Sequence, residues 1–361
     1  MPLSSSNKLT TWTILAPLAG WVILIAGMLS AQGWLQWLAA IALAGSVFAA
    51  VHHAEMVAHR VGEPFGTLVL AVAITVIEVA LIVSMMVSAG PEKAALARDT
   101  VFAAVMLVCN GIVGVCLFMG ALRHREQVFQ APGANVALAV LAALAVLTMV
   151  LPNYTTATPG PEFSRSQLAF AGVSSLVLYC CFIFVQTIRH RDYFLIKDSS
   201  DESEHAPPPT AGVALISAVM LIVCLVAVVG LAKQLSPTVE TGVALMGAPE
   251  ATVGIVIALL VLLPEGLAAV RAATANRLQT SLNLALGSVL ACIGLTIPSV
   301  AAVSAVIDRP LALGLEPKET VLLALTLVVS TLTLGMGRTN ILQGVVHLIV
   351  LAAYLFLAFA P

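Results

Sequence analysis

A single carboxylate interrupts an apolar stretch in the second half of this sequence. Residues 252–264 carry no charge, Glu265 follows them directly, and the next charged residue is Arg271. A charged side chain at the centre of a membrane-spanning helix costs about 2.5–3.5 kcal/mol, so such a residue is a candidate functional group. Pro264 lacks an N–H and therefore leaves the Leu260 carbonyl without its helical partner. A carboxylate beside a freed carbonyl at membrane depth suits a hard cation.

The first half of the chain contains a second carboxylate of the same kind. Glu78 stands between Glu63 and Glu92 with no other charge in the interval. Among the 18 acidic residues, only Glu78 and Glu265 lie well inside long apolar stretches. We expect both to bind the cation and to couple it to protons, because a carboxyl group that holds a proton no longer attracts a cation. The alternative is a neutral carboxylic acid that only joins helices.

Three uncharged polar residues lie inside neighbouring apolar stretches. Asn110, Asn283 and Ser288 carry oxygens that can complete the coordination of a metal cation. Side chains of these types also hydrogen-bond membrane helices to one another. The residue types leave both roles open, and all three residues are candidate metal ligands.

A segment rich in histidine closes the second apolar stretch. His52, Glu55 and His59 are spaced i, i+3 and i+7, so they share one face of a helix. The pattern fits a vestibule that collects cations and senses pH, or simply a helix end at the membrane surface. A zinc metalloprotease motif is excluded, because HAEMVAH is not H-E-x-x-H.

The composition indicates the environment of these residues. The chain is 60% hydrophobic and 9% charged, whereas soluble domains carry about 25% charged residues, so we predict an all-α polytopic membrane protein. A net charge of −2 argues against nucleic acid as a partner. The six cysteines lie in apolar stretches without a CxxC motif, which argues against a disulfide framework and a zinc site.

The hydropathy predicts about eleven transmembrane helices. Their approximate bounds are 12–30, 34–52, 65–89, 100–121, 134–151, 167–188, 211–231, 247–269, 280–303, 317–336 and 341–360. Of the 16 Lys and Arg residues, ten flank these helices on the side of the N-terminus and six on the other side. The positive-inside rule therefore predicts a cytoplasmic N-terminus and an external C-terminus.

The eleven helices divide into one plus five plus five. We predict an extra N-terminal helix at 1–33, five-helix repeats at 34–191 and 211–361, and an acidic, Pro-rich cytoplasmic linker at 192–210. Glu78 and Glu265 each stand on the second helix of a five-helix block. Because five is odd, two similar blocks enter the membrane from opposite faces, which gives the inverted repeat of many secondary transporters.

These features resemble the calcium/cation antiporter superfamily, most closely its calcium/proton exchanger branch and the bacterial Ca²⁺/H⁺ (Na⁺/H⁺) antiporters. That family carries a GNAxE motif in each repeat and a Gly-Ser segment on the following helix. The motif glutamates fall on Glu78 and Glu265. In the second repeat the family's Asn-basic pair falls on Asn276–Arg277 and its Gly-Ser segment on Gly287–Ser288. The resemblance covers nearly the whole chain and implies the same plan of repeats.

The sequence departs from the family at the motif amides. Glu78 follows Val76–Ile77, and Glu265 follows Leu263–Pro264, in place of the family's Gly-Asn. Cys109–Asn110–Gly111 replaces the first Gly-Ser segment. These changes bear on ion selectivity more than on the fold or the class of reaction.

The resemblance implies a secondary active antiporter of the inner (plasma) membrane, and not an enzyme. We expect it to export Ca²⁺ in exchange for H⁺ by alternating access, with both ions competing for Glu78 and Glu265. A Na⁺ (or K⁺)/H⁺ antiporter on the same fold is the alternative, and an intramembrane metal-dependent enzyme using the His52 face is the third hypothesis. The expected partners are cations, protons and membrane lipid, without nucleic acid and without a cofactor beyond the transported ions.

Overall fold

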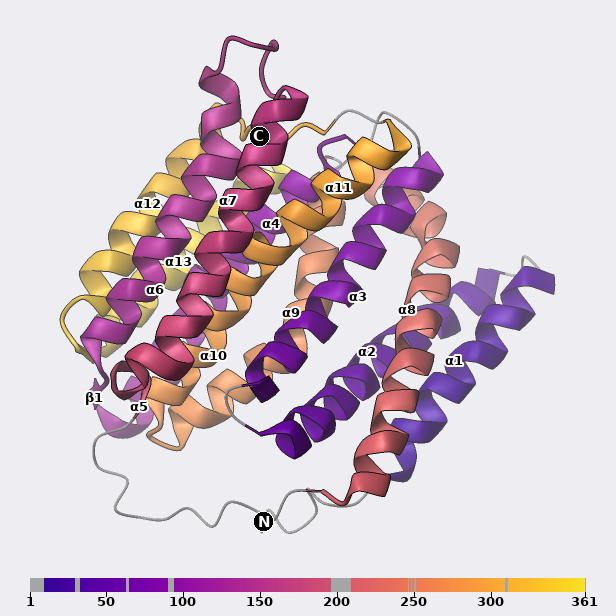
Figure 1. Cartoon of the computed structure of the whole chain (residues 1–361), viewed down its shortest axis with the longest axis horizontal. Coiled ribbons are helices and arrows are strands. Elements are labelled where there is room, and N and C mark those ends of the chain that lie inside the picture. The colour runs from indigo at the N-terminus through magenta and orange to yellow at the C-terminus, as the bar shows by residue number, and fades with distance from the viewer. Residues whose placement is uncertain are drawn as a thin grey trace. The chain divides into compact units, whose positions relative to one another are not determined.

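The structure is a computed structural model, and it describes residues 10–29, 33–62, 65–89, 94–195, 209–245, 247, 249, 251–308 and 311–360. Long helices make up almost all of this described chain (Figure 1). Most of the predicted acidic linker, residues 196–208, lies outside the described residues.

Helical elements follow one another through the described chain. In chain order they are α1 (Thr11–Leu29), α2 (Gly33–Val61), α3 (Phe65–Ala89), α4 (Leu96–Met106), η2 (Leu107–Ile112), α5 (Val113–His124), α6 (Ala131–Ala145), η3 (Val146–Val150), η4 (Leu151–Tyr154), α7 (Arg165–Phe184), η5 (Val185–Arg189), η6 (Arg191–Phe194), α8 (Ala211–Leu245), α9 (Ala251–Thr274), α10 (Leu278–Ala291), η7 (Cys292–Thr296), α11 (Ile297–Ile307), α12 (Pro317–Leu334) and α13 (Ile341–Phe359).

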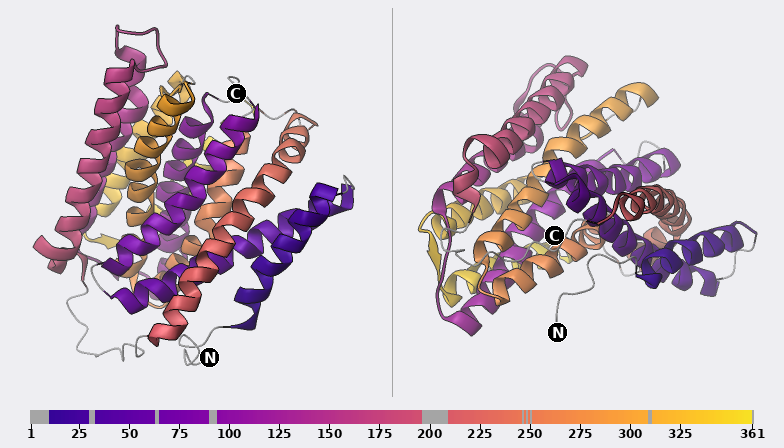
Figure 2. Two further views of the ribbon diagram at one scale, coloured as in Figure 1. Left: turned by 45° about the vertical axis from the view of Figure 1, so that its right-hand side comes forward. Right: turned by 60° about the horizontal axis from the view of Figure 1, so that its bottom comes forward.

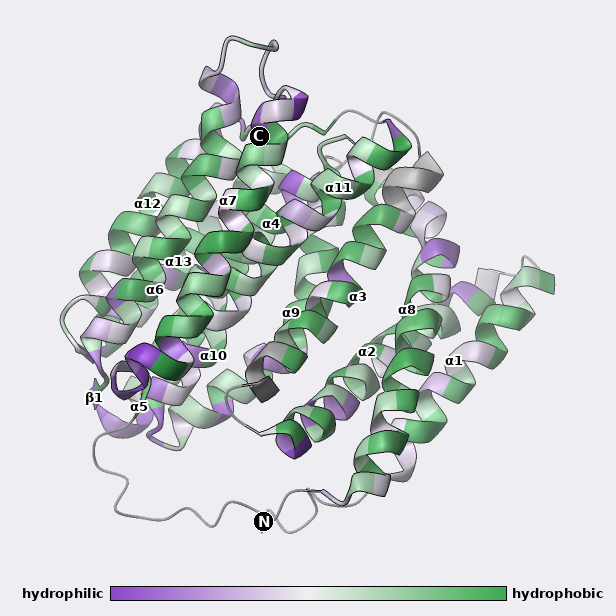
Figure 3. Cartoon of the chain, viewed as in Figure 1, coloured by the Kyte–Doolittle hydropathy of each residue, from purple (hydrophilic) through white to green (hydrophobic). Residues whose placement is uncertain are grey.

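These elements confirm the predicted all-α membrane architecture of about eleven spans. Within the described residues, ten continuous helical segments are long and apolar enough to cross a membrane. The apolar stretch Ala71–Ser84 of α3 adds a shorter one among the described side chains. Figure 3 shows apolar residues along most of each helix and hydrophilic residues gathered toward helix ends. The inverted relation of the two repeats remains a prediction.

The chain forms two compact units, and the first contains α1, α2, α3 and most of α8. In this unit α1 and α2 pack along each other (Figure 2). Gly20 of α1 allows the close approach, because a Cβ atom there would lie 2.9 Å from Ser46 Oγ of α2. The Trp21 indole donates a hydrogen bond to the Val223 carbonyl at 3.3 Å, which joins α1 to α8.

The second unit contains α4 to α7 and α9 to α13. Here α9 packs against both α4 and α10, and α13 packs against α5. An antiparallel ribbon pairs β1 (Gln127–Val128) with β2 (Arg338–Thr339), so the α5–α6 and α12–α13 connections are joined. Arg98 of α4 donates to the Asp99 carboxylate at 2.8 Å and to the Gly314 carbonyl at 2.9 Å, which fixes the segment before α12.

The compact units divide the chain differently from the two predicted repeats. The first repeat, 34–191, supplies α2 and α3 to the first unit and α4 to α7 to the second. The second repeat, 211–361, supplies most of α8 to the first unit and α9 to α13 to the second. Each predicted repeat therefore contributes helices to both units.

Two spans at corresponding places in the predicted repeats share an irregularity. A π-helical turn, η2, connects α4 to α5, and another, η7, connects α10 to α11. Such turns inside α-helices frequently occur at functional sites. Asn110 lies within η2, and Ser288 lies one turn before η7. The turns therefore mark the parts of both spans where candidate ligands were predicted.

Candidate functional site

The α9–α10 hairpin brings Glu265 and Ser288 together. Between the two helices Asn276 has φ 60°, a left-handed conformation that asparagine adopts more readily than most residues. Glu265 precedes Asn276 by eleven residues and Ser288 follows it by twelve, so antiparallel helices place them at similar depth. The Ser288 hydroxyl donates a hydrogen bond to the Glu265 carboxylate. The hairpin thus assembles a carboxylate and a neutral oxygen, as a cation site requires.

Pro264 changes the backbone next to this pair without ending the helix. α9 continues from Ala251 to Thr274 through the proline. Because proline has no N–H, the Leu260 carbonyl receives no hydrogen bond from residue 264. The predicted release of one carbonyl oxygen near Glu265 therefore follows from the chemistry of proline in a continuous helix.

Glu78 lies in α3, within the first unit. Its side chain is 4% exposed, and Ile77 and Leu81 beside it are buried as well. A carboxylate in such apolar surroundings is stable only when a proton, a cation or hydrogen-bond donors compensate its charge. The other four candidate residues belong to the second unit: Glu265, Ser288, Asn110 and Asn283.

Asn110 is buried in η2 and takes part in a polar network. Its amide nitrogen donates to Thr326 Oγ1 at 2.9 Å, and its amide oxygen lies 3.3 Å from His347 Nδ1. Thr326 belongs to α12 and His347 to α13, so the amide joins three helices of the second unit. These hydrogen bonds show that Asn110 joins helices, and its role as a metal ligand remains a prediction.

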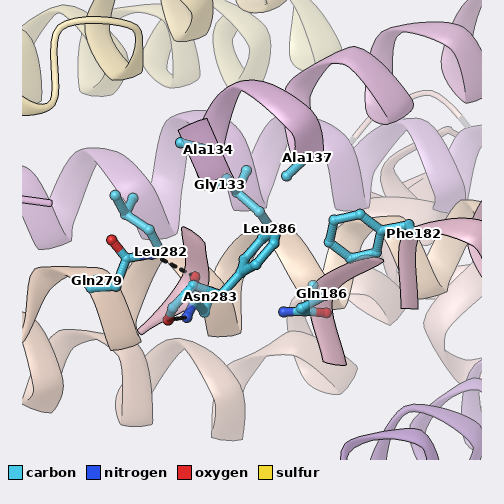
Figure 4. Close-up of a pocket in the computed structure, with 11 residues that line it drawn as sticks. Gly133, Ala134, Ala137, Phe182, Gln186, Gln279, Leu282, Asn283 and Leu286 are labelled. Atoms are coloured by element: carbon cyan, nitrogen blue, oxygen red, sulfur yellow. Dashed lines mark hydrogen bonds between the residues drawn. The ribbon is translucent and has the colours of Figure 1, made fainter. Parts of the chain in front are cut away.

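Asn283 is engaged at both ends of its amide group. Its nitrogen donates to the Phe194 carbonyl at 2.7 Å, and its oxygen accepts from Gln279 Nε2 at 2.9 Å. Figure 4 shows Asn283 and Gln279 together beside a small pocket that Phe182 and Phe194 also line. These bonds hold the segment after α7 against α10. They fit the helix-joining alternative, while a role in metal binding stays a prediction.

The histidine-rich end of α2 belongs to the first unit. Glu55 and His59 are exposed, whereas His52 is half-buried with its ring centroid 6.2 Å from that of Trp12. His53, which the sequence pattern did not select, is buried beside the Thr13 carbonyl at 3.2 Å from Nε2. Among the described residues, no group of three or more His, Cys, Asp and Glu side chains could hold a metal ion. The vestibule remains a prediction.

The sequence reasoning missed His347 and Thr326, the two partners of Asn110 on other helices. Both are fully buried in the second unit. His347 had a usable signal, because an ionisable residue inside an apolar span is a functional candidate whether it is acidic or basic. Thr326 had no such signal, since threonine is common in membrane helices as a helix-joining residue.

Comparison with known proteins identifies the family. The model of the sodium/calcium exchanger protein family matches residues 32–188 and 216–360. The chain therefore belongs to this family, and it is a multi-pass membrane transporter of the calcium/cation antiporter superfamily. Membership of a family of exchangers sets aside the hypothesis of an intramembrane enzyme.

Two curated relatives and one solved structure show how closely the chain matches. It is 49% identical to the "Putative ionic transporter y4hA" of Sinorhizobium fredii (strain NBRC 101917 / NGR234), over 99% of this chain and 98% of the relative. It is 36% identical to the sodium-potassium/proton antiporter ChaA of Escherichia coli (strain K12), over 90% of this chain and 88% of the relative. The structure of native YfkE matches the fold with a TM-score of 0.75 and 16% identity, over 97% of this chain and 100% of that chain.

The Glu265–Ser288 bond predicts a graded effect of substitutions at Ser288. Ser288→Ala removes the hydroxyl and should raise the half-saturating cation concentration about two- to tenfold, the effect of one net hydrogen bond. Ser288→Thr keeps the hydroxyl and should stay near wild type. The measurement is a cation titration of exchange by purified protein in proteoliposomes. Equal affinities for wild type and Ser288→Ala would show that the hydroxyl does not serve the cation.

Proposed function

We propose that this chain is a secondary active antiporter that exchanges a metal cation for protons across the plasma membrane. The carrying observation is the hydrogen-bonded pair of Glu265 and Ser288 inside membrane-length helices of a sodium/calcium exchanger family member. Glu78, buried in α3, supplies a second carboxylate. A buried carboxylate binds a cation when ionised and loses that attraction when a proton neutralises it.

Exchange follows from this competition. A cation that reaches the ionised carboxylates displaces their protons, and protons that arrive from the other side displace the cation. Alternating access opens the site to one side at a time, so the downhill entry of protons drives the cation out. Ten of the 16 Lys and Arg residues lie on the side of the N-terminus, which supports a cytoplasmic N-terminus and an external C-terminus.

Na⁺ or K⁺ is the transported cation that we place first. The Escherichia coli relative is named a sodium-potassium/proton antiporter and is 36% identical over 90% of this chain. Ca²⁺ takes about six to eight oxygen ligands. The Asn283 amide already makes hydrogen bonds through both of its polar atoms, which reduces the number of neutral oxygens on offer. A smaller oxygen set favours a monovalent cation.

Ca²⁺, which the sequence placed first, is the second candidate. Two carboxylates, Glu78 and Glu265, match the charge of a divalent cation. The matching family model is that of sodium/calcium exchangers, which also favours this candidate.

A competition series distinguishes the two cations. Purified protein in proteoliposomes with an imposed proton gradient is offered Na⁺, K⁺ or Ca²⁺, and proton efflux is followed by a pH-sensitive dye. We expect Na⁺ or K⁺ to drive proton movement at lower concentration than Ca²⁺. If Ca²⁺ acts at the lowest concentration, the second candidate replaces the first, and if no cation moves protons, the proposed function is wrong.

Neutralising either of the two carboxylates should abolish exchange. Glu78→Gln and Glu265→Gln keep the side-chain size, so exchange should fall to the level of protein-free vesicles. The melting temperature should be maintained, because a neutral amide is easier to bury in a membrane helix than a charge. Glu126→Gln, at an exposed position in the α5–α6 connection, is the matched control and should exchange like wild type. Wild-type exchange rates in Glu78→Gln or Glu265→Gln would refute the assignment of these carboxylates to the cation site.

Acidification of the side from which the cation binds should weaken the apparent affinity of the protein for the cation. Protons and the cation compete for Glu78 and Glu265, so each competing proton should raise the half-saturating concentration up to about tenfold per pH unit. Saturating cation should restore the maximal rate. The measurement is a set of initial rates at several pH values with the proton gradient held constant. An affinity that does not change with pH would point to separate proton and cation sites.

A further inference from the structure

The second unit contains a fully buried polar network that the proposed exchange does not yet use. Asn110 of η2, Thr326 of α12 and His347 of α13 are each 0% exposed. The Asn110 amide stands between the other two, 2.9 Å from Thr326 Oγ1 and 3.3 Å from His347 Nδ1. Three polar side chains from three helices therefore meet in an apolar interior, where each unmade hydrogen bond costs about 1–3 kcal/mol.

The donors and acceptors of this network fix which way the amide faces. A carbonyl oxygen only accepts hydrogen bonds, so His347 Nδ1 carries the hydrogen and donates to Asn110 Oδ1. The Thr326 hydroxyl donates its hydrogen to Met106 Sδ at 3.4 Å, which leaves its lone pairs for the Asn110 amide nitrogen. Met106 Sδ, which only accepts hydrogen bonds, also lies 3.9 Å from the Asn110 amide nitrogen, so the NH₂ group has two acceptors on this side. The amide nitrogen therefore faces Thr326 and Met106, and the amide oxygen faces His347.

Two features of the backbone indicate that the arrangement is built around this contact. Asn110 lies in the π-helical turn η2, where side chains leave the regular helical directions. Gly114 makes room for α13, because a Cβ atom there would lie 3.1 Å from His347 Cβ. The imidazole therefore sits directly against the helix that carries the amide.

The oxygen held in this way keeps capacity for a cation. A carbonyl oxygen has two lone pairs, and His347 occupies one of them. An amide that is fixed with its oxygen toward the cation can therefore add a neutral ligand. A freely rotating amide turns its NH₂ group toward the cation part of the time. If the amide is already ordered before the ion arrives, less conformational entropy is lost when the ion binds.

We propose that His347 and Thr326 are positioning residues that hold the Asn110 amide with its oxygen available to the transported cation. This inference rests on the proposed function, because it assigns Asn110 to the cation site of the antiporter. His347 and Thr326 act through Asn110 and do not contact the ion.

The test compares single and double variants in a cation titration of proteoliposome exchange. Asn110→Ala, His347→Leu and Thr326→Val should each raise the half-saturating cation concentration about two- to tenfold, with a smaller effect on the maximal rate. His347→Gln retains an N–H donor and should recover part of the affinity. The double variant Asn110→Ala/His347→Leu should match Asn110→Ala alone, because His347 has nothing left to position.

Two matched controls test for a general packing effect. Ser330→Ala removes a buried hydroxyl one turn after Thr326 that has no hydrogen-bond partner among the described residues. Tyr354→Phe removes a buried hydroxyl two turns after His347 on the same helix. Both should bind the cation like wild type, and melting temperatures of all variants show whether each is folded.

The outcomes separate this inference from the proposed function. Effects of Asn110→Ala and His347→Leu that multiply in the double variant would overturn the positioning role, as would wild-type affinity in Asn110→Ala. Loss of affinity only in proportion to loss of melting temperature would also overturn it. If Glu78→Gln and Glu265→Gln abolish exchange while Asn110→Ala behaves like wild type, only the inference fails. If both glutamate variants exchange normally, the proposed function itself fails.

Discussion

The placement of carboxylates within apolar helices is the constraint on which this structure depends. Glu78 is 4% exposed in α3, and Glu265 is half-buried in α9, directly after a proline. A negative charge in such a place needs compensation from a proton, a cation or hydrogen-bond donors. The Ser288 hydroxyl gives Glu265 one donor, which orients the carboxylate without neutralising it. A carboxylate in such a place can change between its ionised and its protonated form, and this is the property that the proposed exchange uses.

The surrounding helices supply the geometry for that balance. The tight α9–α10 turn, with Asn276 at φ 60°, sets the register that puts Ser288 opposite Glu265. The π-helical turns η2 and η7 interrupt the two spans that hold equivalent places in the predicted repeats. Regular helices would be simpler to insert into a membrane. Irregular turns within membrane-length helices therefore indicate that particular side chains have to point in directions that a regular helix does not allow.

The sequence predicted the parts of this arrangement that depend on local pattern. Hydropathy gives the helices because each span is a run of apolar residues, and the buried position of Glu78 follows from the same signal. The Glu265–Ser288 contact was predictable as well, since a short hairpin pairs residues at equal distances from its turn. The long-range partners of Asn110 and Asn283 were not, because Thr326, His347 and the Phe194 carbonyl are 89 to 237 positions away in the chain. No local periodicity encodes such contacts, and the π-helical turns likewise arise from packing between helices.

These long-range contacts also change the argument about the cation. From residue types alone, Asn110 and Asn283 are two further oxygens for a divalent ion. In the structure both polar atoms of each amide make hydrogen bonds, and each amide oxygen accepts one of them. The number of neutral oxygens therefore depends on hydrogen bonds made elsewhere in the bundle. Under the proposed role of Asn110, the residues that orient an amide contribute to ion selectivity together with the amide itself, so a motif comparison by residue type alone does not give the transported ion.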